Sequence, residues 1–397
     1  MKKVLITTLE TFFLITLFFF TISALFIDWG EQQFSFLAQS FLHGSLDISQ
    51  FPTALNDAVF FAGKYYWPLG PFPALILTPF VFIFNFLNSF FYQKYLQIPL
   101  IFGIIYLIYV ISKKIGYKAK DALYLAASFV FASPFLAIIL YSWSWQFAIV
   151  VSVFLIFLAI YEHFTKKRYV IIGIIYACLL LTRVTASFGI VFFILDVIFS
   201  KSTSKQKVLS LVKLLTPLFI ALVLLFIYNY TRFGNIFEQG YSYQILRGGV
   251  LKAREYGLFS LIHVPGNLYY FLLATPAPVL LDGVSRVLKF PYIAYDPWGM
   301  SIFFTSPYFL YLFFMKYRDL TSKFLWITVV AIALPIFLYY GVGPRQFGYR
   351  YSLDFLPFIF LILIKNYKIQ KGNLHPGFKL LIIVAYLFDL YLLMTHV

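Results

Sequence analysis

Cysteine and charge are both scarce in this chain of 397 residues. The one cysteine, Cys178, lies inside a hydrophobic run, so no disulfide framework exists, and it says little about the redox compartment. Only 12% of the residues are charged, whereas a soluble domain averages about 25% charged residues. Hydrophobic residues make up 62%, against about 45–50% in a soluble domain. Both departures indicate that lipid is the main solvent of this chain.

The sequence also shows no internal repeat and no low-complexity segment. Many transporters consist of two related halves with broken helices at corresponding positions, and the long first loop of this chain has no counterpart in its second half. The net charge of +16 raises the question of nucleic-acid binding. Because the basic residues are spread through short loops rather than gathered in one patch, we expect no nucleic-acid partner.

Long apolar runs predict an all-α, multi-pass membrane protein. The first run, Val4–Ile27, is longer than the roughly 7–15 residues of a signal-peptide core, so we interpret it as a retained helix that enters from the cytoplasm. Ten further runs complete a predicted bundle of about eleven spans: Tyr95–Ser112, Ala122–Tyr141, Trp145–Tyr161, Tyr169–Leu181, Val184–Phe199, Val208–Tyr228, Met300–Met315, Phe324–Tyr340, Tyr351–Ile364 and Phe378–Met394. Two apolar stretches rich in Pro, Gly or Asn, Phe72–Phe91 and Leu258–Leu281, are interpreted as interfacial or re-entrant helices on the outer side.

The distribution of lysine and arginine supports these spans, because cytoplasmic loops of membrane proteins carry an excess of both. Most of the 31 basic residues fall in loops assigned to the cytoplasm. Counting Phe72–Phe91 as a full span would move the cluster Lys113–Lys120 to the outside. We therefore expect a single transmembrane domain over residues 1–397, in the plasma or inner membrane, with a first outer loop at 28–94 and a second outer region at 229–299.

Carboxylates in the first outer loop are candidates for a general base. Asp28 and Glu31 lie three residues apart at the exit of the first predicted helix, and Asp57 precedes the aromatic run that begins at Gly63. Acids at a solvated helix end are also common without any catalytic role. Asp47 looks more like a turn residue.

Lys64 stands beside clustered aromatic residues, Tyr65 and Tyr66, in the same loop. An ammonium group can bind the phosphate of a lipid carrier while the rings lie against a lipid chain or a sugar. The alternative is an ordinary aromatic belt with a lysine that extends to the interface.

Arg183 lies between two short apolar runs, in LLLTRVTAS. A lipid-exposed arginine costs about 3 kcal/mol or more, so this side chain must have polar company. We expect it at an outer turn, where a phosphate would be a natural partner. The alternative is an Arg–Asp pair within the bundle.

Two further outer motifs contribute candidate ligand-binding residues. The first, YNYTRFGNIFEQGYSYQ, supplies Arg232, Glu238 and Tyr241 as substrate-binding candidates. The second, GVGPRQFGYRYSLDFLP, supplies Arg345 and Arg350 as phosphate-binding candidates and Gln346 and Asp354 as substrate-binding candidates. Arg350 and Asp354 are four residues apart and could simply pair with each other.

Four runs together resemble the GT-C glycosyltransferases, whose relatives include protein O-mannosyltransferases and lipid A aminoarabinose transferases. The runs are FLAQSFLHGSLDI, GKYYWPLGPFPALILTPF, YNYTRFGNIFEQGY and FGYRYSLDFLP, and they cover roughly residues 28–360. The resemblance implies a GT-C-like bundle that takes a hexose, for example mannose, from a polyprenyl phosphate at the outer membrane face. The acceptor would be a glycan, a lipid or a protein, and the anomeric centre would invert.

The resemblance also bears on the site residues. Lys64 would match a lysine that relatives place before their proline-aromatic run, and Arg183 a cation after the fifth span. Many relatives carry an Asp-Glu pair where this chain has Gly30 and Glu31, so the base remains Asp28, Asp57 or Glu31. We expect no cofactor, and no divalent metal site is evident in the sequence. A flippase for lipid-linked sugars and an inactive subunit of a glycan-assembly complex are the alternative functions.

Overall fold

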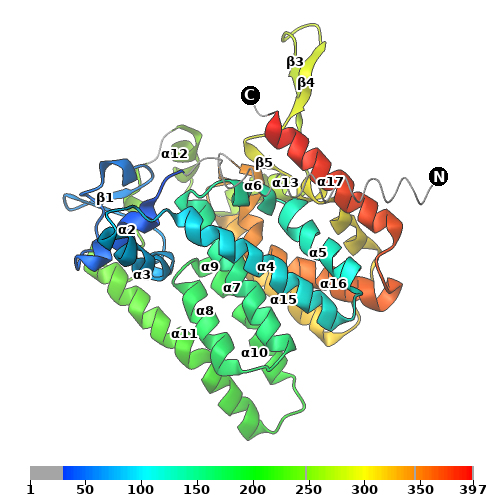
Figure 1. The fold of residues 1–397 in the computed structure, drawn as a ribbon, viewed down its shortest axis with the longest axis horizontal. Coiled ribbons are helices and arrows are strands. Elements are labelled where there is room, and N and C mark those ends of the chain that lie inside the picture. The colour runs from blue at the N-terminus through cyan, green and yellow to red at the C-terminus, as the bar shows by residue number, and fades with distance from the viewer. Residues whose placement is uncertain (1–29, 246–247, 344–345, 396–397) are drawn as a thin grey trace.

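The computed structural model describes residues 30–245, 248–343 and 346–395, which form a helical bundle with short strand pairs toward one end (Figure 1). Within these residues, five helices are long and apolar enough to cross a membrane: α4 (Gln93–Ile115), α7 (Ser144–Phe164), α11 (Ser204–Phe233), α15 (Leu320–Leu338) and α17 (Pro376–Met394). The predicted first helix, Val4–Ile27, lies outside the described residues, as do Asp28 and Arg345.

The other α-helices are shorter: α2 (Gln33–Leu42), α3 (Phe72–Phe86), α5 (Ala119–Phe131), α6 (Phe135–Leu140), α8 (Tyr169–Leu180), α9 (Val184–Ser187), α10 (Ile190–Ile198), α12 (Gly248–Arg254), α13 (Val264–Leu272), α14 (Ile302–Thr305) and α16 (Leu356–Lys371). Five 3₁₀ turns complete the described helical elements: η1 (Pro52–Ala54), η2 (Tyr241–Tyr243), η3 (Leu261–His263), η4 (Pro307–Phe314) and η5 (Arg350–Asp354).

Four of the predicted spans are divided in the structure; one of them, Tyr351–Ile364, becomes most of η5 and the first part of α16. Ala122–Tyr141 becomes α5 and α6, which are separated just before Pro134, and Val184–Phe199 becomes α9 and α10. Met300–Met315 becomes α14 and η4, with Pro307 at the start of η4. Proline lacks a backbone N–H and cannot continue a preceding helix, which accounts for the breaks at Pro134 and Pro307. The count of eleven spans therefore remains a prediction.

The mostly helical class is confirmed, but an all-α chain is not what the structure shows. Within the described residues, three two-stranded sheets occur: β1 (Val59–Phe61) with β2 (Lys64–Tyr66), β3 (Ala277–Leu280) with β4 (Leu288–Ala294), and β5 (Trp298–Met300) with β6 (Gln346–Gly348). The first two pairs are antiparallel and the third is parallel. Strands β1, β2, β4 and β6 lie in segments predicted to be outer loops, where hydrophobic length gives no strand signal. Strand β3 lies in Leu258–Leu281, which we interpreted as an interfacial or re-entrant helix, and that interpretation is wrong for its last part.

Local sequence explains where the longest helix begins and ends. At the start of α11, the hydroxyl of Thr203 accepts from the Gln206 N–H while the Gln206 side chain accepts from the Thr203 N–H, which is a capping box. At its end, Gly234 adopts a left-handed conformation (φ 67°) that favours glycine. The last turn of α11 carries Arg232, which the helix thereby positions at the end of the bundle that holds the strands.

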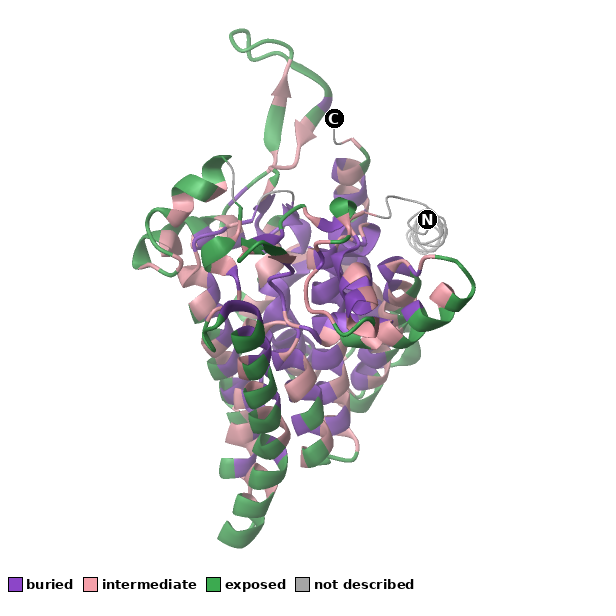
Figure 2. Ribbon diagram, turned by 90° about the vertical axis from the view of Figure 1, so that its left-hand side faces the viewer, coloured by how far each residue is buried: buried purple, intermediate pink, exposed green. Residues whose placement is uncertain are grey.

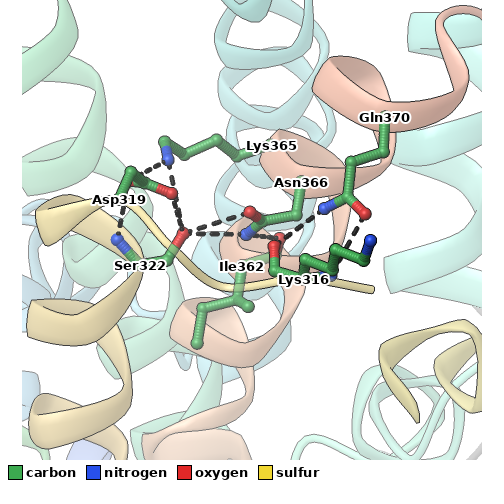
Figure 3. A network of polar contacts seen from close by, with 7 residues as sticks. All are labelled: Lys316, Asp319, Ser322, Ile362, Lys365, Asn366 and Gln370. Atoms are coloured by element: carbon green, nitrogen blue, oxygen red, sulfur yellow. Dashed lines mark hydrogen bonds and ion pairs between the residues drawn. The ribbon is translucent and has the colours of Figure 1, made fainter. Parts of the chain in front are cut away.

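Buried residues gather in the middle of the bundle, and one side of its longest helix is exposed (Figure 2). At the end away from the strands, a polar network joins α15 to α16 (Figure 3). Asp319 caps α15 by accepting from the Ser322 N–H at 3.0 Å and forms an ion pair with Lys365. The Asn366 amide donates to the Ser322 hydroxyl at 2.9 Å. This network holds the two helices in a fixed register.

Candidate functional site

A cavity of about 470 Å³ lies between α8, α9, α11 and α15, under the loops at 68–70 and 237–242. Its polar lining consists of Thr182, Arg183, Thr185, Asn229, Arg232, Glu238, Gln239, Tyr241, Ser242, Tyr339 and Tyr351. Its apolar lining includes Leu180, Phe188, Leu225, Phe237, Phe259 and Ile336. Cationic and apolar walls in one cavity suit a ligand that has a charged group and a hydrocarbon part.

Arg183 reaches the cavity from the break between α8 and α9, where its extended backbone precedes the first turn of α9. Its guanidinium donates from Nε to Asp354 Oδ1 at 2.7 Å and from Nη2 to Asp354 Oδ2 at 3.0 Å. The Thr185 hydroxyl donates to the same carboxylate. The Arg–Asp pair considered for Arg183 is thus present. The alternative that Asp354 pairs locally with Arg350 is wrong, because the Asp354 carboxylate accepts from Arg183 instead.

Arg232 lines the cavity and also bonds to its own neighbours. Its guanidinium donates to the Trp67 carbonyl at 2.7 Å and to Asn229 Oδ1 at 3.0 Å, and it lies 3.8 Å from the centroid of the Tyr228 ring. It therefore fixes the first outer loop against α11. Asn229, the first residue of an N-x-T sequon, is buried and donates to the Ile236 carbonyl, which indicates a structural role for that amide.

Among the residues that the structure describes, Glu238 is the one acidic residue in the cavity lining. Its carboxylate accepts from the backbone N–H groups of Gly240 at 2.6 Å and Ser242 at 3.3 Å, so the loop itself orients it. Tyr241 stands beside it in the lining. Burial raises the pKa of the Tyr241 phenol above its ordinary value despite the nearby Arg183, so the phenol remains a hydrogen-bond donor.

The first-loop acids lie at different distances from the cavity lining. Asp57 is exposed, and its carboxylate accepts from the indole N–H of Trp145 at 3.2 Å. Because Trp145 lines the cavity, Asp57 is one side-chain contact away from it. The Glu31 carboxylate instead accepts from the amides of Gln33 and Asn56 and is absent from the described lining.

Lys64 does not join Arg183 in this cavity. Its ammonium lies 3.6 Å from Asp47, and its side chain is 58% exposed. The Asp47 carboxylate also accepts from Ser45 and Ser49; burial opposes these contacts, but together with Lys64 they hold its pKa below the ordinary value. Asp47 lies between two turns, where its carboxylate accepts from the Ser49 N–H two residues later, and Lys64 lies beside it, outside the lining.

The tyrosines next to Lys64 pack on other rings. Tyr65 lies 4.9 Å from Phe60 between ring centroids, and the buried Tyr66 lies 5.4 Å from Phe233. Neither belongs to the described lining of the cavity. The Tyr65 ring therefore packs within the β1–β2 hairpin, and the Tyr66 ring attaches the hairpin to the end of α11.

The motif GVGPRQFGYRYSLDFLP, residues 341–357, supplies some residues to the cavity lining and others to the surrounding structure. Gln346 is buried in β6, where its amide donates to the carbonyls of Trp298 and Val342, and it is not part of the cavity lining. The Arg350 guanidinium lies 5.4 Å from the centroid of the Tyr351 ring, and Tyr351 lines the cavity. Gln346 thus ties β6 to Trp298 and Val342. Arg350 contacts a lining residue, Tyr351, but is not itself part of the lining.

Sequence reasoning missed several lining residues. Thr182 and Thr185 flank Arg183 in an otherwise apolar run, and this polar cluster was a usable signal. Trp145 and Tyr351 gave none, because each joins the lining only through tertiary packing. Within the described residues, no group of three or more His, Cys, Asp or Glu side chains could hold a metal ion.

The apolar helices and the cavity place this chain among multi-helix membrane proteins. No protein-family profile and no curated protein sequence matches it. A solved structure with partial similarity is the crystal structure of the Archaeoglobus fulgidus oligosaccharyltransferase in the apo form, with a TM-score of 0.44 and 13% identity over 92% of this chain. The chain spans about half the length of that protein, 51%. The role of each side chain therefore rests on the geometry of this chain alone.

Proposed function

We propose that this chain is a GT-C-type glycosyltransferase that moves a sugar from a polyprenyl-phosphate carrier to an acceptor at the outer membrane face. The observation that supports this most is the cavity in which Arg183 and Arg232 share the lining with Glu238 and with an apolar wall. A polyprenyl-phosphate sugar has parts that match this lining: a phosphate for the arginines, sugar hydroxyl groups for Glu238 and a hydrocarbon chain for the apolar wall.

Arg183 is the cation that we assign to the donor phosphate. Its two bonds to Asp354 leave other N–H groups of the guanidinium for a phosphate oxygen. Arginine suits this role because it presents several donors in a fixed plane and stays charged when buried. Lys64 is engaged with Asp47 in the structure, so we give it no part in phosphate binding in this proposal.

A carboxylate of the first outer loop is the base. It takes the proton of the acceptor hydroxyl, the oxygen attacks the anomeric carbon from the opposite face, and the bond to the carrier phosphate breaks, which releases the polyprenyl phosphate. Of the two acids that the structure describes in this role, Asp57 is better placed than Glu31, because it contacts Trp145 of the cavity lining. Glu238 and Tyr241 are then available for the hydroxyl groups of the sugar.

The test is transfer from a synthetic polyprenyl-phosphate hexose in membranes that contain the intact chain, with release of polyprenyl phosphate measured by mass spectrometry. We expect Arg183→Ala to reduce the rate per amount of folded protein about tenfold or more, because a hydrogen bond to a charged group contributes about 1.5–3 kcal/mol. The amount of folded protein is measured for each variant, because this change also breaks the buried pair with Asp354. Arg286→Ala is the matched control, since Arg286 is exposed on the β3–β4 hairpin. Transfer from a nucleotide sugar without a lipid carrier would refute the proposal.

A further inference from the structure

Lysines from two turns that are far apart in the sequence gather at the end of the bundle opposite the cavity. The last turn of α4 carries Lys113 and Lys114, and Lys118 follows in the turn before α5. The last turn of α16 carries Lys368 and Lys371, just before the turn to α17. Helix α16 starts two residues after Asp354, the ion-pair partner of the cavity residue Arg183, and ends at Lys371, so it connects the two ends. We refer to these five lysines as the basic patch.

Direct contacts make the two turns one surface. The Tyr117 hydroxyl, from the first turn, donates to the Ile364 carbonyl of α16 at 2.7 Å. The Lys368 ammonium lies 5.1 Å from the centroid of the same tyrosine ring. The Asp121 carboxylate of α5 accepts from the Leu374 N–H at 3.1 Å. The spacing between the lysines of the two turns is therefore fixed by the fold.

The charge of the basic patch is not neutralised within the described residues. Asp121, the acid beside it, already pairs with Lys379 at 2.7 Å, and Lys113, Lys114 and Lys371 are exposed and make no ion pair there. The adjacent lysine of the polar network, Lys365, is likewise occupied by Asp319 (Figure 3).

The turn between α7 and α8 provides the contrast. It also carries three consecutive basic residues, but Lys167 pairs with Asp196 at 2.7 Å and Arg168 pairs with Glu162 at 2.9 Å. Basic residues in a turn direct membrane insertion whether or not they form ion pairs in the folded protein. The role of a topology signal therefore does not explain why one turn is paired and the basic patch is not. The charge of the basic patch has no ion-pair partner within the described residues, which suits an anionic ligand.

We propose that the basic patch binds the headgroup of an anionic phospholipid. The patch lies at the ends of apolar helices, at the level where headgroups meet water, and basic clusters between helices at this level bind anionic headgroups. The ammonium groups of Lys113, Lys118 and Lys371 would contact the phosphate oxygens. This site is independent of sugar transfer, so its failure and that of the proposed enzymatic function are separate results.

The experiment measures phosphatidylglycerol binding to the purified full chain in a mild detergent by native mass spectrometry, with phosphatidylcholine as the zwitterionic comparison. The test variant is Lys113→Gln combined with Lys118→Gln. Its matched control is Lys201→Gln combined with Lys205→Gln, which removes two exposed lysines, one from the turn between α10 and α11 and one from the first turn of α11. Lysine near an anionic surface contributes about a fivefold factor, so the test variant should bind about 30-fold more weakly.

Three results decide the proposal. It is supported if only the test variant loses phosphatidylglycerol and if Lys113→Arg combined with Lys118→Arg retains it, because arginine keeps the charge. Equal losses in the test and control variants would overturn it, since the binding would then follow net charge alone. Equal binding of phosphatidylcholine by the intact chain would overturn it too.

Discussion

Arg183 and Asp354 lie 171 residues apart in the sequence and form a two-point ion pair. Their side chains are 8% and 1% exposed. The pair ties the break between α8 and α9 to the turn η5 that precedes α16, and it closes one wall of the cavity. A cation held in this way keeps its place whether or not a ligand is bound.

Removing the carboxylate should destabilise the protein strongly. Asp354→Ala leaves the Arg183 charge buried without its partner, and breaking a buried ion pair from one side typically costs about 3–5 kcal/mol. We expect a large drop in the thermal unfolding temperature of the purified protein in detergent. Arg350→Ala is the control, because Arg350 contacts a ring but makes no ion pair in the described part of the chain. Similar unfolding temperatures for the two variants would contradict this account of the pair.

Asp57→Asn should abolish most of the sugar transfer while the protein remains folded. The amide keeps the size of the carboxylate but cannot accept a proton from a hydroxyl, and loss of a general base typically costs about 100- to 10,000-fold in rate. Glu31→Gln should have a smaller effect, because that carboxylate is engaged by two amides. The rate of polyprenyl-phosphate release is the measurement.

The control for Asp57 is Asp282→Asn, because Asp282 is exposed on the β3–β4 hairpin. Full activity of the Asp57 and Glu31 variants would exclude both as the base. Asp28, which lies outside the described residues, would then be the remaining first-loop candidate.

The sequence predicted the long helices well and the partners within the site poorly. Hydrophobic length depends only on local composition, so α4, α7, α11, α15 and α17 could all be located from it. Pairing depends on which turns meet. The sequence offered Arg350 as a possible local partner for Asp354 and an unspecified aspartate as a possible partner for Arg183, and the structure pairs Asp354 with Arg183, 171 positions away. The contact between Asp57 and Trp145, 88 positions apart, had no local signal either.

Asp319 should make stability depend on pH at the end of the bundle away from the cavity. Burial opposes its ionisation, but hydrogen bonds from Lys365 and Ser322 lower its pKa from 3.8 to about 2. A lowered pKa in the folded state gives stability that is fully present above about pH 4 and is lost as the pH falls toward about 2. Asp319→Asn should therefore lower the unfolding temperature at neutral pH, and its difference from the natural chain should shrink across that interval.

Glu255→Gln is the control for this experiment, because Glu255 is exposed on a loop. Its unfolding temperature should follow that of the natural chain at each pH. A difference for Asp319→Asn that stays constant down to pH 2 would show that the Lys365 and Ser322 contacts do not favour the ionised carboxylate.

The sidedness of the bundle can be tested with single cysteines on a Cys178→Ala background. Asn56→Cys and Asn235→Cys should react with an impermeant maleimide in intact cells, whereas Lys118→Cys and Lys205→Cys should react only after permeabilisation. All four positions are exposed in the structure, so burial cannot account for a missing reaction. The physical reason concerns the charge that follows α3. A crossing by α3 would move the cluster Lys113–Lys120 to the outside, against the excess of basic residues that cytoplasmic loops carry, so we expect the chain to stay on one side between Asn56 and Gln93. Labelling of Lys118→Cys in intact cells would mean that α3 does cross, which would place the basic patch on the outside.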